Sequence, residues 1–279
     1  MRRSQARMLN RTAAYVLLTA AVVITVSPLL WAVGTSVKAP AEYFTRPPRL
    51  IPEEPTPVHY VALFERVGFQ RFLLNSAKVM VASTAIALVA GVTGAYSVTR
   101  FGTGGRIFLL LVLMQRMAPP VAIAIPFFVL MLRVGLLNNW IGLAATHVAM
   151  NLAVALWLMI GFFREVPREL DEAAMVDGCT RFSALVRVVL PLAAPGIAAT
   201  AILLSVFSWN EFFFAVVMTR TAQAQTVPVI VSSFVIPTIG LEWGLMAAAG
   251  VVAVLPVLVL AFFAQRYLVR GLVAGSVKG

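Results

Sequence analysis

Three ionisable residues interrupt the apolar stretches of this sequence and are its first candidates for chemistry: Arg116, His147 and Glu211. Each stands in a stretch long enough to cross a bilayer, where a charged side chain costs about 3 kcal/mol or more unless a partner satisfies it. Ionisable groups retained in such segments relay protons, line ion pathways or bind polar ligands. We therefore treat all three as candidate site residues.

His147 and Glu211 are predicted to lie at a similar depth in the membrane. At a rise of about 1.5 Å per residue, His147 is about eight residues inward from the start of stretch 140–163. Glu211 is about eight residues inward from the end of stretch 196–219. Because these two ends face the same side of the membrane in the topology described below, the two side chains could share one layer.

Hydrogen-bonding and aromatic residues accompany this pair. Asn151 follows His147 by one helical turn, and Trp209 and Asn210 precede Glu211 directly. Amide and carboxylate groups beside an aromatic face suit a ligand rich in hydroxyl groups. The candidate substrate pathway therefore comprises Trp209, Asn210, Glu211, Arg116, His147 and Asn151.

Purely structural roles remain open for the same residues. An intramembrane His or Asn can serve as a hydrogen-bonding group between helices, worth about 0.6 kcal/mol or somewhat more. Glu211 can also simply neutralise Arg116 or a cation of a partner chain. The sequence does not decide between these roles and direct contact with a ligand.

Motifs for catalysis and nucleotide binding are missing from the sequence. It contains no H-E-x-x-H, G-x-S-x-G or Cys/His cluster, and no G-x4-G-K-[ST] phosphate loop. The glycine-rich residues 102–105 lack the Lys and Ser/Thr that such a loop requires. We expect no catalytic residue, no metal and no cofactor on this chain, so that energy for any transport must come from elsewhere.

The composition requires a membrane. Hydrophobic residues make up 61% of the 279 residues and charged residues only 12%, with a mean hydropathy of +0.92. Since about 20 apolar residues cover the hydrocarbon core as a helix, the sequence predicts an all-α membrane protein with six spans in one domain, 1–279. The predicted spans are 13–35, 79–99, 107–132, 140–163, 196–219 and 245–264. The third should be kinked or broken, because Arg116, Pro119, Pro120 and Pro126 interrupt it.

The distribution of Lys and Arg predicts the orientation. If the N-terminus lies in the cytoplasm, thirteen Lys and Arg fall on the cytoplasmic side and two in the short outer loops. We therefore expect both termini in the cytoplasm of a bacterium and a multi-pass protein in its inner membrane. The net charge of +11 fits attraction to anionic lipid headgroups and does not indicate nucleic acid.

Two segments outside the predicted spans are long enough for roles of their own. Residues 36–78 form a proline-dense stretch that turns helical near 61–67, and serve either as a tether or as a docking surface for an extracytoplasmic partner. Residues 164–195 hold five of the eleven acids of the chain. Pro167 suits a helix start and Gly178 a helix stop, which predicts a short surface helix over 168–176.

The faces of this short helix are predicted from its periodicity. Leu170, Ala173 and Ala174 should form one side, where the small alanines permit close approach to another surface. Glu169 and Glu172 should face away from that side. An interfacial helix lying on lipid headgroups is the alternative, but an anionic leaflet would repel so many acids.

The segment resembles the permease subunits of binding-protein-dependent ABC importers, which carry the pattern E-A-A-x3-G-x9-I-x-L-P. The matching residues, with Val in place of Ile, are Glu172, Ala173, Ala174, Gly178, Val188, Leu190 and Pro191. Further short matches are similar to the carbohydrate branch, the maltose-type permeases: Asn75-Ser76, Pro126-Phe127-Phe128, Asp177-Gly178 and Trp209-Asn210-Glu211-Phe212. Residues 115–120 are similar to a subset that includes polyol and disaccharide importers.

The resemblance implies the type I permease fold and a role in ATP-driven import of a sugar or polyol. In that family the short helix is a coupling helix that docks on an ATPase subunit. It implies ATPase-coupling roles for Glu172, Ala173, Ala174, Asp177, Gly178, Leu190 and Pro191. It also implies a second permease subunit, ATPase subunits that hold ATP and Mg, and an extracytoplasmic sugar-binding protein as partners.

Two other functions compete with this one. An ion-coupled secondary transporter would use Glu211, His147 and Arg116 as a charge relay, but it leaves the E-A-A segment unexplained and the spans show no obvious internal repeat. A membrane-embedded enzyme has no supporting motif.

Overall fold

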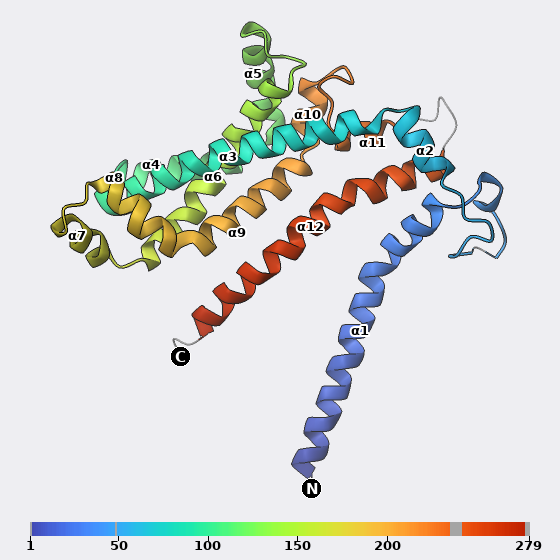
Figure 1. Ribbon diagram of the computed structural model, residues 1–279, viewed down its shortest axis with the longest axis horizontal. Coiled ribbons are helices and arrows are strands. Elements are labelled where there is room, and N and C mark those ends of the chain that lie inside the picture. Colours follow the sequence, from blue (N-terminus) through green and yellow to red (C-terminus); the bar gives the residue numbers. More distant parts are fainter. Residues whose placement is uncertain (1, 48, 235–241, 277–279) are drawn as a thin grey trace. The chain divides into compact units, whose positions relative to one another are not determined.

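The computed structural model describes residues 2–47, 49–234 and 242–276, and within these ranges the secondary structure is entirely helical (Figure 1). The chain forms two compact units, one of residues 1–69 with 231–254 and the other of residues 70–230 with 255–279. The all-α fold predicted from the sequence is confirmed.

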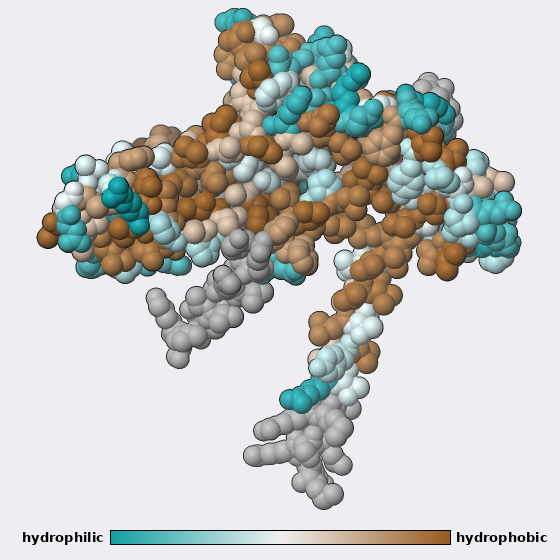
Figure 2. All heavy atoms as spheres, viewed as in Figure 1, coloured by the Kyte–Doolittle hydropathy of each residue, from teal (hydrophilic) through white to brown (hydrophobic). Residues whose placement is uncertain are grey.

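Five described helices are long and apolar enough to cross a membrane. Their apolar spans are Arg11–Ser36 of α1 (Arg2–Ser36), Phe69–Phe101 as α3, Trp140–Glu165 as α6, Arg181–Trp209, and Trp243–Gln265 of α12 (Trp243–Ser276). The most apolar window of α1 is not buried against the rest of the chain, and apolar side chains are visible on the coloured part of this helix among paler residues (Figure 2). Such a surface requires lipid or a partner chain to cover it.

The third predicted span is broken, as its prolines indicated. It consists of α4 (Gly105–Met117) and α5 (Pro120–Arg133), which are separately too short to span a bilayer. Ala118 and Pro119 between them are extended, with ψ angles of 133° and 131°. A residue before proline disfavours the helical conformation, and here two such residues follow each other.

The fifth predicted span, 196–219 as one helix, is wrong at both ends. The helix starts at Arg181, as α8 (Arg181–Ala184), a π-helical turn η2 (Leu185–Val189) and α9 (Leu190–Trp209) in direct succession. It ends at Trp209, and a separate helix α10 (Phe213–Met218) follows. The π-helical turn η2 precedes Pro191 and Pro195, two residues without an amide hydrogen. These prolines were predicted to end the loop 164–195, whereas they lie inside the helix.

The second span also begins earlier than predicted, at Phe69 rather than Val79. The segment between α1 and α3, residues 37–68, is therefore shorter than predicted, and we call it the outer segment after its predicted side of the membrane. It contains a 3-10 turn η1 (Pro40–Glu42) and a helix α2 (Val58–Glu65) close to the predicted helical stretch. Hydropathy missed the first turns of α3 because Arg71 and Lys78 interrupt the apolar run.

The outer segment is packed rather than extended as a tether. The buried His59 ring lies 2.6 Å from the Tyr43 hydroxyl and donates from Nε2 to the carbonyl oxygen of Lys38 at 2.8 Å. A Cβ atom at Gly244, near the start of α12, would collide with both rings. Glycine at this position therefore lets α12 begin directly against the outer segment.

The second unit is built around α3, α6 and α9. Their shared core includes Ala95, Met159, Phe163 and Ala193. Gly91 of α3 lies against Ala155 of α6 so closely that a Cβ atom would collide with it. Such close approach of backbones is typical of helix pairs in membranes. A second cluster joins α3, α5, α6 and α10, and α11 (Val227–Ser233) follows α10 in the chain.

Candidate functional sites

The acid-rich helix forms over the residues predicted for it, as α7 (Arg168–Val176). Pro167 precedes it in an extended conformation, and Glu169 and Asp171 lie in its first turn, where carboxylates complement the helix dipole. At its end Gly178 has a φ of +88°, the left-handed conformation that favours glycine. The amides of Gly178 and Cys179 donate to the carbonyls of Met175 and Ala174 at 3.1 and 2.9 Å, which is a complete Schellman cap.

The faces of α7 differ from the prediction. Ala173 is exposed whereas Ala174 is 7% exposed and packs toward this chain's own core, so the two alanines do not form one docking seam. The outer face instead presents Glu172 and Ala173 beside Val176, which is 88% exposed. Apolar and acidic groups therefore share the surface that α7 offers to a partner.

The remaining residues of the predicted coupling set lie where the chain returns to the membrane. Asp177 is the exposed C-cap residue of α7. Leu190 is half-buried against the core of the second unit, and the exposed Pro191 is in the first turn of α9. Since α8, η2 and α9 run in direct succession, a short loop joins α7 to one long helix.

A buried ion pair that was not predicted from the sequence holds the inner face of α7. Arg100 Nε, at the end of α3, lies 2.7 Å from Asp171 Oδ2, and the two side chains are 6% and 8% exposed. The Tyr96 hydroxyl donates to Asp171 Oδ1 at 3.1 Å. Sequence reasoning counted Asp171 among the surface acids and Arg100 only as the boundary of a span.

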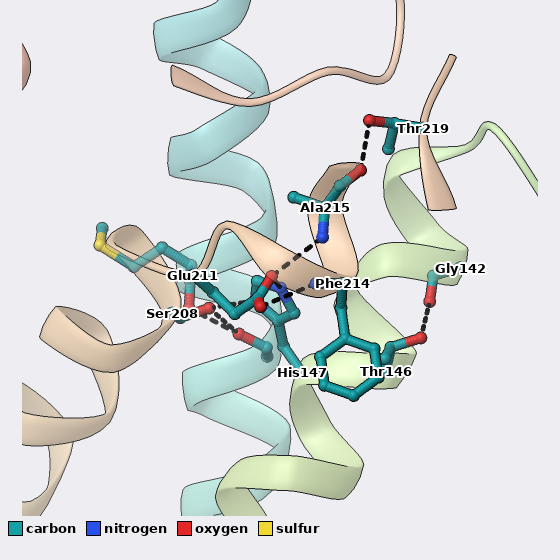
Figure 3. A network of polar contacts seen from close by, with 10 residues as sticks. Gly142, Thr146, His147, Ser208, Glu211, Phe214, Ala215 and Thr219 are labelled. Carbon is teal, nitrogen blue, oxygen red and sulfur yellow. Dashed lines mark hydrogen bonds and ion pairs between the residues drawn. The ribbon is translucent and has the colours of Figure 1, made fainter. Parts of the chain in front are cut away.

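The second candidate site joins three buried side chains on three helices to the half-buried Glu211 in the break after α9 (Figure 3). His147 Nε2 lies 3.2 Å from Glu211 Oε2, which confirms that the two residues share one layer. His147 Nδ1 lies 2.7 Å from the Ser208 hydroxyl, and Ser208 lies 2.8 Å from the hydroxyl of Ser83 on α3. Ser83 and Ser208 were missed because hydroxyl groups in an apolar stretch carry no charge.

Glu211 also caps the helix that follows it. Its Oε1 accepts from the amide of Phe214 at 2.8 Å, and its Oε2 accepts from the amide of Ala215 at 3.0 Å (Figure 3). Capping satisfies amides that a helix start leaves without partners. Because an ionised carboxylate only accepts, the ring nitrogen Nε2 of His147 must be the donor to Glu211. Glu211 thus links α6 to the start of α10.

One further pathway candidate, Asn210, bonds to its own helix rather than to this network. Asn210 is exposed, and its side chain donates to the carbonyl of Val206 in its own helix at 2.9 Å. Trp209 and Asn151 are buried, each 4% exposed. The side chain of Arg116 lies outside the described residues. A cavity of about 320 Å³ at the α4–α5 break is lined by other residues: Gln115, Ala118, Pro120, Ile123, Met150 and Ala153.

Known proteins of one family match this chain over most of its length. Residues 72–273 match the family described as binding-protein-dependent transport system inner membrane component. The sulfoquinovosyl glycerol transport system permease protein of Agrobacterium fabrum is 35% identical over 90% of this chain and 88% of its own. The trehalose transport system permease protein of Mycobacterium tuberculosis is 34% identical, over 90% and 92% of the two chains.

A solved structure shares the fold. It belongs to a bacterial ABC transporter involved in the import of the acidic polysaccharide alginate, with a TM-score of 0.81 and 23% identity over 94% of this chain and 96% of that chain. The family match over residues 72–273 includes α7 and the end of α3 that holds it. Together with the family match and the relatives, this shows that the chain belongs to the binding-protein-dependent transport system inner membrane components, the multi-pass permease subunits of ABC transporters.

Proposed function

We propose that this chain imports a sugar or polyol as one of two permease subunits that together enclose the translocation pathway. The observation that carries the proposal is α7, a capped helix of nine residues with an exposed face of acidic and apolar groups. A short rigid helix fixed at its inner face can receive force from an ATPase subunit. The proposed coupling residues are Glu172, Ala173, Asp177 and Gly178, with Ala174, Leu190 and Pro191 as their support.

The substrate class rests on the relatives. Their names specify sulfoquinovosyl glycerol, trehalose and, for a Streptomyces coelicolor protein that is 33% identical, diacetylchitobiose. All three compounds carry sugar rings with many hydroxyl groups. A substrate of that kind would reach this chain from an extracytoplasmic binding protein, and ATP with Mg would be held by the ATPase subunits.

The ion-coupled alternative is supported only by the His147–Glu211 pair. A relay requires a carboxylate that can exchange its proton with the transport path. Here both carboxylate oxygens of Glu211 accept from backbone amides of α10. The pair therefore fits a link between helices better than a relay.

Reconstitution tests the proposal. The chain, assembled in liposomes with the permease, ATPase and binding proteins encoded beside it, should take up a radiolabelled sugar that the binding protein binds. Uptake should require ATP at the cytoplasmic face and persist when ionophores abolish the membrane potential and the pH gradient. Uptake that continues without ATP and stops with the ionophores would establish the ion-coupled transporter instead.

We predict that both termini and the α7 loop are cytoplasmic and that the outer segment lies on the opposite side. In a Cys179→Ser background, Pro55→Cys should react with a membrane-impermeant maleimide added to intact cells, because residue 55 is exposed in the outer segment. Unsubstituted Cys179 is the matched control and should react only after the membrane is opened. The reverse labelling pattern would invert the topology.

A further inference from the structure

The last two turns of α3 contact the α7 segment at three successive places. At the start of α7, the Arg100 guanidinium donates to the carbonyl of Val166 at 3.0 Å, and Arg168 Nη2 donates to the carbonyl of Thr99. Within α7, Arg100 and Tyr96 hold Asp171. These contacts fix the entry and the first turn of α7 on α3.

The exit from α7 is held by the same end of α3. The Arg181 guanidinium lies over the Phe101 ring, 4.6 Å from its centroid, and the Tyr96 hydroxyl lies 3.4 Å from the carbonyl oxygen of Arg181. We call Tyr96, Thr99, Arg100 and Phe101 the α3 socket. Both legs of the coupling segment and its middle therefore rest on one helix that is distant in sequence.

Among the contacts between the α3 socket and α7, the Arg100–Asp171 pair resists displacement most strongly. Both side chains are almost fully buried, so that separating them would leave two charges without water. The Nε–Oδ2 approach is a charge contact rather than an aligned hydrogen bond, while Tyr96 supplies the directional bond to the other oxygen. Position and direction of Asp171 are thus both fixed from α3.

The rest of α3 connects this socket to the intramembrane site. The helix has 33 residues and no proline, which gives a rod of about 50 Å. Ser83 lies 17 residues before Arg100, about 25 Å along the helix, and joins α3 to Ser208. At the outer end, Asn75 Nδ2 donates to the carbonyls of residues 222, 223 and 225, and Ser76 accepts from the amide of Val227.

We infer that Arg100, Asp171 and Tyr96 are positioning residues that clamp α7 to α3, and that α3 carries each displacement of α7 to the Ser208–His147–Glu211 network. This inference deepens the proposed function and rests on it. The route through α3 acts in parallel with the covalent one through α8 and α9. Without the clamp, α7 would still dock on an ATPase subunit, but it would move without moving α3.

The decisive variant removes both charges at once. Arg100→Gln with Asp171→Asn keeps hydrogen-bonding groups of similar shape and leaves no unpaired buried charge. We expect normal yield of the assembled transporter and sugar-stimulated ATP hydrolysis within about twofold of normal, with at least a fivefold fall in sugar transported per ATP hydrolysed. The matched control, Arg164→Gln with Glu165→Gln, makes the same kind of change at two exposed residues outside the socket and should keep the native ratio.

Cys179 provides a second readout that needs neither sugar nor ATPase. As the only cysteine, it can carry a nitroxide label next to the cap of α7 in the chain reconstituted alone in nanodiscs. The label should become more mobile in the Arg100→Gln/Asp171→Asn variant, less so in Tyr96→Phe, and not in the Arg164→Gln/Glu165→Gln control. A purely local packing defect elsewhere would not follow this order.

The outcomes separate the clamp from the proposed function. Unchanged label mobility in the double variant would overturn the clamp whatever the complex transports. Increased mobility with a native ratio of sugar to ATP would overturn the transmission through α3. If the double variant gives no complex, charge reversal decides: recovery of transport in Arg100→Glu/Asp171→Arg over each single reversal supports the pair, and equal failure of all three overturns it. Absence of ATP-driven uptake by the unmodified complex would instead refute the proposed function, while the label would still report on the clamp.

Discussion

Glu172→Arg is expected to abolish ATP-driven sugar uptake, by at least 50-fold, while the chain still inserts and assembles with its partner permease. Glu172 is exposed on the outer face of α7, so its reversal should not disturb the fold of this chain. The reversed charge would stand in the surface that we propose to dock on an ATPase subunit, where like or unpaired charges cost several kcal/mol. Transport and ATP hydrolysis in proteoliposomes, together with complex yield, measure the effect.

Two comparisons make this expectation specific. Glu165→Arg reverses an exposed charge at the end of α6, one helix earlier, and should leave uptake close to normal. Gly178→Val should match Glu172→Arg in effect, whereas Gly178→Asn should keep much of the uptake, since Asn tolerates the left-handed conformation that a φ of +88° demands. The space around Gly178 is open, so backbone strain and not collision is the cause. Normal uptake by Glu172→Arg would remove α7 from the coupling path.

The parts of the fold that the sequence predicted are those with local causes. The bounds of α7 follow from Pro167 and Gly178, which act on their immediate neighbours. The break between α4 and α5 likewise follows from the consecutive Pro119 and Pro120. In each case a residue restricts its own backbone or that of its neighbour, so the helix boundary can be predicted without knowledge of any distant contact.

The parts that the sequence missed depend on contacts between distant residues. Stretch 196–219 was predicted as one helix with Asn210 and Glu211 inside it, yet the helix ends at Trp209 and Glu211 caps a new one. Likewise, Asp171 looked like its acidic neighbours, although it pairs with Arg100, 71 residues away. Periodicity assigns a residue to a face of its own helix but does not identify what covers that face.

Glu211→Gln is expected to lower the thermal stability of the chain and the yield of the complex without changing which sugars are transported. Both carboxylate oxygens accept hydrogen bonds, from the amides of Phe214 and Ala215 and from His147. A Gln side chain has one acceptor oxygen and one NH2 group, so at least one of these donors would face another donor. An unsatisfied buried group of this kind costs about 1–3 kcal/mol.

The neighbours of Glu211 supply the controls. Asn210→Ala removes only a bond within α9 from an exposed side chain and should leave stability and transport nearly unchanged. His147→Gln should destabilise the chain as Glu211→Gln does. Combining the two should cost less than the sum of the single changes, because groups in one hydrogen-bond network couple. Thermal unfolding of each variant in detergent gives these values.

The same variants distinguish the link from a sugar-lining role, which the depth of Glu211 in the membrane had suggested. If Glu211 contacts the passing sugar, Glu211→Gln should assemble with normal yield and unfold at the normal temperature, and its uptake rates for related sugars should change relative to one another. If Glu211 only links the helices, the yield of the complex should fall and the uptake rates of all sugars should fall by the same factor. A repositioned α10 would narrow the pathway without contacting the substrate. Both carboxylate oxygens already bind donors of this chain, so a sugar hydroxyl would have to displace one of them. We therefore expect Glu211→Gln to lower the uptake rates of all sugars by the same factor.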